Sequence, residues 1–87
     1  NQFSLAQNYP NPFNPTTTIS YALPVQSHVT LKVFNVLGQA VSMLVNGIED
    51  PGMHSVRFDG SGVPSGVYFY RLQAGSYSAT KMLMIVK

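Results

Sequence analysis

Glycine and proline divide the chain into short segments in which apolar and polar residues alternate, and this pattern is typical of β-strands. Residues 18–23 place Ile19, Tyr21 and Leu23 on one face, and Pro24 ends the segment because proline has no N–H for a strand ladder. No stretch keeps apolar residues at the helical spacing i, i+3, i+4 and i+7 without an interrupting glycine, proline or β-branched run. The alternation therefore excludes a helical fold.

Five further segments have strand character, and they are residues 28–35, 40–45, 53–58, 67–74 and 77–86. Gly38 and Gly75 lie in the tight turns of two predicted hairpins, and Gly66 opens another strand. Turn residues at 46–47 and 50–52 bracket one more connection. We therefore predict an all-β fold without helix, a small antiparallel immunoglobulin-like β-sandwich of about six to seven strands.

The composition excludes several function classes. Hydrophobic residues make up 45% of the chain and charged residues 9%, whereas disordered chains combine low hydrophobicity with high charge. The five basic residues are scattered, so the dense basic stripe that nucleic-acid binding needs is absent. The chain has no cysteine for a disulfide or a thiolate metal site, and no apolar run approaches the roughly 20 residues of a membrane-spanning helix. A low-charge chain rich in Ser, Thr, Asn, Gly and Tyr fits an extracellular β-domain.

The residues that usually carry catalysis or bind metal are few and dispersed. His54 alternates with Val56 and Phe58, so we predict that its ring faces the core rather than a metal ion. Asp50 and Asp59 each begin a turn motif, in which aspartate typically closes a local hydrogen bond. The loop after Asp59 lacks the alternating acids and the terminal glutamate of a calcium loop. The sequence therefore predicts no catalytic residue, no metal site and no cofactor.

Residues 1–17 differ in composition from the sandwich that we predict over residues 18–87. The prolines of this segment favour extended backbone at the residue before each of them, and its aromatic side chains are candidate anchors. The residues with these roles are Tyr9, Pro10, Pro12, Phe13 and Pro15. We predict a stiff strap across the edge of the sandwich, with a proline-rich linker as the alternative. One hypothesis stacks Tyr9 or Phe13 on Phe34 and Phe69, which point away from the predicted core.

Five stretches form a specific combination that covers nearly the whole chain. They are FSLAQNYPNPFNPTTTISYALP at residues 3–24, VTLKVFNVLGQAV at 29–41, PGMHSVRFDG at 51–60, PSGVYFYRLQAG at 64–75 and SATKMLMIVK at 78–87. In this combination the chain resembles the C-terminal sorting domain of type IX secretion cargo proteins, the type A or Por secretion system family.

The resemblance implies a non-catalytic immunoglobulin-like domain at the C-terminus of a larger cargo protein in a Gram-negative bacterium. The implied route leads through the periplasm to the cell surface or the medium. The implied partners are the outer-membrane secretion machinery and a processing protease or sortase, which removes the domain and links the cargo to a surface lipopolysaccharide. We expect no nucleic acid, no transmembrane segment and a monomeric isolated domain.

A sorting signal needs a displayed surface, and the last predicted strand is the best candidate for it. Its apolar residues occupy both faces, which burial of one face does not explain. Two structures account for such a run. One is a central strand covered on both sides, and the other is an exposed face or edge that docks a partner. The lysines at its two ends serve as gatekeepers against aggregation, or an acidic patch on the receptor recognises them. The candidate recognition residues are Lys81, Met82, Leu83, Met84, Ile85, Val86 and Lys87.

Two other function classes stay open. The segment GVYFY at residues 66–70 is similar to a strand in the immunoglobulin-like domain of the flagellar hook-capping protein, so a structural spacer or adhesion domain fits the composition. A carbohydrate-binding accessory module is also a β-sandwich with aromatic residues. Such a module normally uses Trp or Tyr platforms beside polar partners, whereas this chain has no Trp and three acidic residues.

Overall fold

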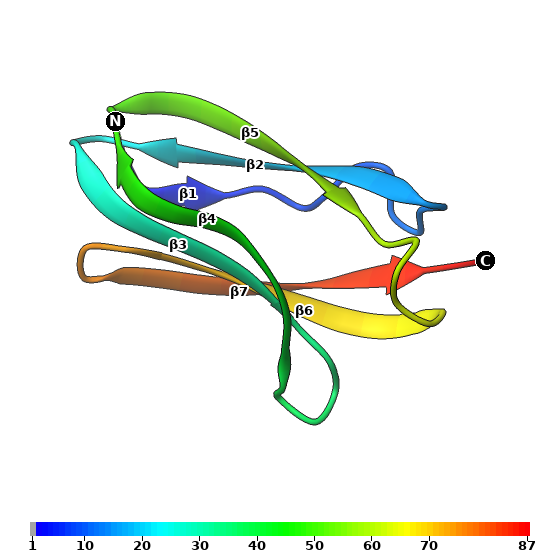
Figure 1. The fold of residues 1–87 in the computed structure, drawn as a ribbon. Helices are drawn as coiled ribbons and strands as arrows, with labels where there is room; N and C mark the ends of the chain where they lie inside the picture. The colour runs from blue at the N-terminus through cyan, green and yellow to red at the C-terminus, as the bar shows by residue number, and fades with distance from the viewer. Residues whose placement is uncertain (1) are drawn as a thin grey trace.

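The computed structural model describes residues 2–87 and consists of seven strands in two antiparallel sheets. The strands are β1 (Ser4–Leu5), β2 (Thr16–Leu23), β3 (Ser27–Phe34), β4 (Ala40–Glu49), β5 (Gly52–Asp59), β6 (Gly66–Ala74) and β7 (Tyr77–Ile85). They pair in the orders β1-β2-β5 and β4-β3-β6-β7, and the sheets form the two layers of a sandwich (Figure 1). Residues 2–87 contain no helix, and hence no helix that could span a membrane. The predicted all-β sandwich is confirmed.

The alternation at residues 18–23 forms most of β2, which begins two residues earlier, at Thr16. Its buried side chains include Ile19 and Tyr21, and the strand pairs with β5 along its whole length. On the other side of β2 lies β1, where Leu5 pairs with Tyr21. A strand of two residues is too short to show a period in the sequence. The sequence therefore does not predict β1, which lies within residues 1–17.

The turn predicted at residues 46–47 is wrong. Asn46 and Gly47 lie within β4 and pair with β3. Two register irregularities in this pairing accommodate extra residues on the β4 side. The edge strand itself continues to Glu49. The chain then turns at Gly52, whose φ of 121° is open to glycine, and passes into the other sheet as β5.

Positive φ angles also occur at the three glycines for which the sequence predicts turn roles. Gly38 has a φ of 81° in the β3–β4 hairpin, and Gly75 has a φ of 59° between β6 and β7. Gly66, the first residue of β6, has a φ of 149°. Residues with a Cβ rarely adopt these conformations, which explains why glycine occupies each position.

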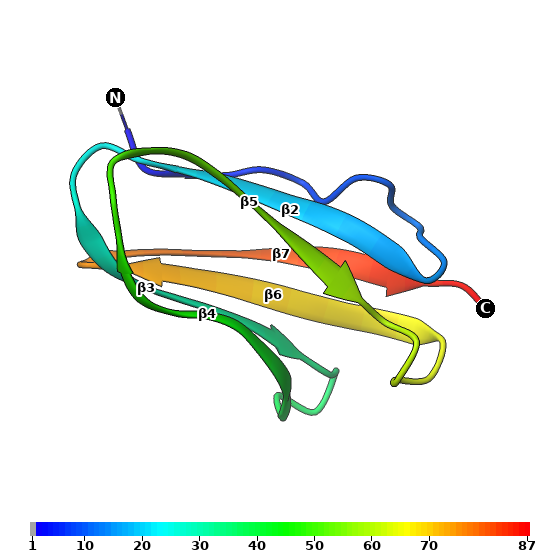
Figure 2. The ribbon, with the colours of Figure 1, turned by 45° about the horizontal axis from the view of Figure 1, so that its top comes forward.

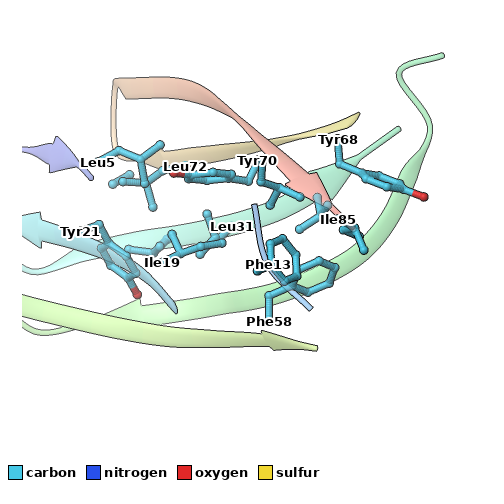
Figure 3. Packing of buried hydrophobic residues seen from close by; sticks show 14 of the residues in the cluster. Leu5, Phe13, Ile19, Tyr21, Leu31, Phe58, Tyr68, Tyr70, Leu72 and Ile85 are labelled. Carbon is cyan, nitrogen blue, oxygen red and sulfur yellow. The ribbon is translucent and has the colours of Figure 1, made fainter. Parts of the chain in front are cut away.

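The hydrophobic core lies between the two sheets and takes side chains from both of them. One further member, Phe13, enters from the segment before β2 (Figure 3). The core residues are Leu5, Phe13, Ile19, Tyr21, Leu23, Val29, Leu31, Val33, Phe58, Tyr68, Tyr70, Leu72, Ala74, Leu83 and Ile85. Within residues 2–87 every buried side-chain nitrogen or oxygen has a hydrogen-bond partner.

His54 packs on the core from the rim of the sandwich. Its ring stacks on Tyr21 with centroids 5.2 Å apart, which agrees with the predicted orientation. Its Nδ1 lies 3.3 Å from Glu49 Oε1, and its Nε2 lies 2.7 Å from the carbonyl oxygen of Asp50. The imidazole therefore joins β5 to the end of β4 and to the turn that connects the two sheets.

Tyr21 makes the stability of the fold sensitive to alkaline pH. Burial raises its pKa, and the hydrogen bond that its hydroxyl donates to Glu49 Oε1 (3.1 Å) and the charge of that carboxylate raise it further. In the unfolded chain a tyrosine pKa is about 10. The unfolded state therefore releases its proton first, and the stabilisation is complete below pH about 10 and is lost as the pH rises through the folded-state pKa.

We expect the free energy of unfolding to fall above pH about 10, and the fall to be shallower in Tyr21→Phe by at most about 1.4 kcal/mol per pH unit. Urea titrations at a series of alkaline pH values measure both slopes. Equal slopes in the two proteins would contradict the assignment to Tyr21.

Candidate recognition site on the last strand

The strand β7 lies at the edge of the four-stranded sheet, where it pairs only with β6. Leu83 and Ile85 face the core and are fully buried, whereas Met82 is 48% exposed and Met84 half-buried on the opposite face. Val86, directly after the strand, is 50% exposed. The apolar run is thus not a central strand covered on both sides. It belongs to an edge strand with one buried and one displayed face.

In Figure 2 the strap runs beside β2. Hydrogen bonds from its residues 7–13 close the part of the free edge of β7 that extends from Met82 to Val86. Because these bonds occupy backbone groups that point away from β6, the strap replaces a neighbouring strand and protects the edge. Phe13 and Ile85 form an isolated parallel bridge. The bonds run from Gln7 Nε2 to Met82 O (2.7 Å), from Met84 N to Asn11 Oδ1 (3.0 Å), from Phe13 N to Met84 O (3.1 Å) and from Val86 N to Phe13 O (3.1 Å).

Phe13 is the apolar anchor of the strap. Its ring is 3% exposed and meets the ring of Phe58 edge-on, with centroids 6.0 Å apart and planes at 68° (Figure 3). Beneath it the backbone of Gly60 approaches closely, and the Gly60 N–H donates to the carbonyl of Pro15 at 2.8 Å. A Cβ on Gly60 would lie 2.9 Å from Ile85 Cδ1 and 3.3 Å from Phe13 Cε2. Because Gly60 has no side chain, the side chains of Phe13 and Ile85 can both pack against its backbone.

Gly60→Ala is expected to lower the free energy of unfolding by about 1–2 kcal/mol, because an added methyl group overpacks this junction. The side chain of Ile85 can move partly aside, which keeps the effect moderate. Gly62→Ala is the matched control, since a Cβ there meets no atom within 4 Å. Urea denaturation of the two variants measures the difference, and equal stabilities would show that the contact at Gly60 has no energetic weight.

A polar anchor holds the strap at its other end. The buried hydroxyl of Tyr70 donates to the carbonyl of Ala6 (2.7 Å) and accepts the N–H of Asn8 (2.8 Å). The side chain of Asn8, 2% exposed, donates to Thr17 Oγ1 (2.9 Å) and to the carbonyl of Pro10 (3.2 Å). Burial raises the pKa of Tyr70, and the N–H from Asn8 partly offsets this. Sequence reasoning missed Asn8 and Thr17, because polar residues beside prolines have the composition of a loop.

Tyr9 and Phe13 do not stack on Phe34 or Phe69, and this hypothesis is wrong. The Tyr9 ring is 81% exposed, and only its backbone is held, through two 3.0 Å hydrogen bonds with Thr18. The strap lies along the edge of β7 and inserts Phe13 between the sheets, so it does not reach the outer face. Phe34 is instead covered by the guanidinium of Arg71, 4.9 Å from the ring centroid.

The remaining predicted residues have these positions. Pro10, Pro12 and Pro15 are all preceded by cis peptide bonds. Lys81 pairs with the core residue Tyr70, which places it on the inward-facing side of β7, and it is half-buried. The ammonium of Lys87 donates to the carbonyls of Ser61 (3.0 Å) and Val63, so the chain after β7 is tied to the loop before β6.

The described residues offer little for chemistry at a reaction centre. Residues 2–87 contain no pocket and no group of three His, Cys, Asp or Glu side chains that could share a metal ion. Asp59 accepts the N–H of Ser61 at 2.9 Å, and this hydrogen bond lowers the pKa of its carboxyl group. Asp59 therefore closes its turn, as predicted from the sequence.

The fold and the closed strand define a class of small all-β sandwich in which an N-terminal strap completes the C-terminal edge strand. The family model described as secretion system C-terminal sorting domain matches residues 7–86, and the chain belongs to this family of type IX secretion sorting domains. The match begins at Gln7 and ends at Val86, so it includes both partners of the closure. A comparison with curated proteins gave no match.

Proposed function

We propose that this domain is the non-catalytic part of a larger exported protein and directs its fused cargo across the outer membrane of a Gram-negative bacterium. The observation that carries the proposal is the family match over residues 7–86. The domain interacts with the outer-membrane machinery after the cargo reaches the periplasm. A processing protease or sortase then removes it, and the cargo is released or attached to the cell surface.

Within this proposal the candidate recognition residues fall into three groups. Met82, Met84 and Val86 present apolar side chains on the displayed side of β7, where a partner can contact them. Leu83 and Ile85 fix the strand in the core, and they act by holding the displayed residues in place. Lys81 and Lys87 border the run at its two ends. Of the predicted strap anchors, Phe13 keeps the edge of the strand closed, and Tyr9, Pro10, Pro12 and Pro15 shape the segment that carries it.

Export of a periplasmic reporter fused to residues 1–87 tests the function in a host with an active type IX system. The matched fusion ends at Ala79 and lacks most of β7. We expect the full fusion alone to reach the surface or the medium, and only when the translocon is intact. Retention of a folded full fusion in the periplasm would contradict the sorting role and favour a structural spacer or adhesion domain.

A further inference from the structure

The outer face of the four-stranded sheet carries an apolar patch that extends beyond β7. Buried residues alternate with residues of this face along β3, β6 and β7, and paired residues of neighbouring strands share a face. The pairing places Phe34, Phe69 and Met82 in one row and Val67 beside Met84 in the next. We call these five residues the outer-face patch. Figures 1 and 2 show no further strand packed on this side of the sheet.

Two cations border the outer-face patch, and neither has a counter-ion within residues 2–87. Lys32 and Arg71 are paired directly across β3 and β6 on the same face, an arrangement in which like charges destabilise a sheet. Arg71 lies over the ring of Phe34. Within residues 2–87 the contact between a basic and an acidic side chain joins His54 to Glu49, whose strand partners Tyr21 and Ser27 are buried, so it does not lie on this face. The other acidic residues, Asp50 and Asp59, lie at the connection between β4 and β5 and at the end of β5.

We propose that the outer-face patch, together with Lys32 and Arg71, docks a protein whose complementary surface is apolar and bordered by carboxylates. This inference rests on the proposed sorting function and specifies the surface and the chemistry of its partner. The apolar side chains supply burial, and a carboxylate facing Lys32 and Arg71 removes their mutual repulsion. The guanidinium is suited to this role because its donors match a carboxylate in a two-pronged geometry.

Charge favours a different protein over a second copy of this chain. Face-to-face pairing of two copies would bring four cations together, since each copy contributes its own Lys32 and Arg71. A lipid surface is also disfavoured, because four of the five patch residues are half-buried and do not project far enough to insert. These residues are Phe34, Val67, Phe69 and Met84. The most exposed apolar side chains of this sheet, Leu37 (79%) and Val36 (68%), lie in the β3–β4 hairpin instead.

The reporter fusion described above, carrying paired substitutions, tests the inference. Met82→Ser with Met84→Ser removes the displayed apolar side chains, and Lys32→Glu with Arg71→Glu reverses the border charge. We expect each pair to lower export at least about tenfold, as loss of interface anchors does. Lys32→Gln with Arg71→Gln should give a smaller loss, and Lys32→Arg with Arg71→Lys should keep most of the export. The matched control is Met53→Ser on β5 with Val25→Ser between β2 and β3, at positions 76% and 57% exposed outside the four-stranded sheet, and it should not change export.

Circular dichroism and thermal unfolding of each purified fusion show whether the substituted domain is folded, and only folded variants are compared. If the unsubstituted fusion is not exported, the proposed function fails and the inference falls with it. If it is exported and the folded variants are exported equally well, the inference alone is overturned. An equal loss in the control pair would also overturn it. Two further results would overturn it, because the face would then have another occupant. One is a dimer in sedimentation, and the other is binding to vesicles of anionic phospholipid, if Met82→Ser with Met84→Ser abolishes either of them.

Discussion

Phe13→Ala is expected to lower the free energy of unfolding by about 3–5 kcal/mol, the usual cost of removing a buried phenylalanine. A domain of 87 residues is stable by only about 4–13 kcal/mol, so this loss is a large share of the total. The ring is buried against Phe58 and beside Ile85, and its own backbone forms the last two hydrogen bonds of the closure. Removing the ring therefore empties a core position and loosens the strap at the same place.

Urea denaturation measures the loss of stability, and amide hydrogen exchange at Phe13 and Val86 measures the opening of the edge. Tyr9→Ala is the matched control, because it removes an aromatic ring that is 81% exposed from the same strap, and its effect should stay within about 0.5 kcal/mol. Equal effects of the two substitutions would contradict the assignment of Phe13 as the anchor.

Tyr70→Phe is expected to cost about 2–4 kcal/mol, although it removes a single oxygen atom, because it leaves two backbone groups of the strap without a partner. These are the carbonyl of Ala6 and the N–H of Asn8, both bonded to the Tyr70 hydroxyl. The aromatic ring and its packing stay in place, so the loss reports the polar anchor alone.

Tyr68→Phe provides the comparison, since its hydroxyl donates one bond, to the carbonyl of Pro64, and should cost about 1 kcal/mol. Chemical denaturation gives both values, and hydrogen exchange at the Asn8 amide shows directly whether the strap is released. A protected Asn8 amide in Tyr70→Phe would mean that other contacts hold this end of the strap.

The strands with regular alternation could be predicted from the sequence, because one buried face imposes a period of two. β2 and β6 are examples, where Ile19 and Tyr21, or Tyr70 and Leu72, recur on the core side. The turn predicted at residues 46–47 failed because the edge strand β4 has only exposed and half-buried positions and an irregular register, which weaken the period of two. Local sequence patterns do not report which strand has a free edge.

The candidate site was harder to predict, since its residues are far apart in the sequence and come into contact only in the folded chain. The apolar run of residues 82–86 indicated a special strand, but its position at the sheet edge depends on topology. The closure by Gln7 and Asn11 depends on side chains that bond to backbone groups far along the chain. The role of Gly60 could not be predicted from the sequence either, because it depends on the close approach of Phe13 and Ile85 in the folded chain.

The closure also has a consequence for the order of events during synthesis. Gln7 and Met82 are 75 positions apart, and Asn11 and Met84 are 73 apart, so the first part of the domain waits for the last before it can dock. Contacts of such long separation form late in folding. A polypeptide interrupted before Val86 leaves Phe13 without its final backbone partner, whatever the state of the preceding strands. A fully closed strap therefore requires a chain that extends at least to Val86.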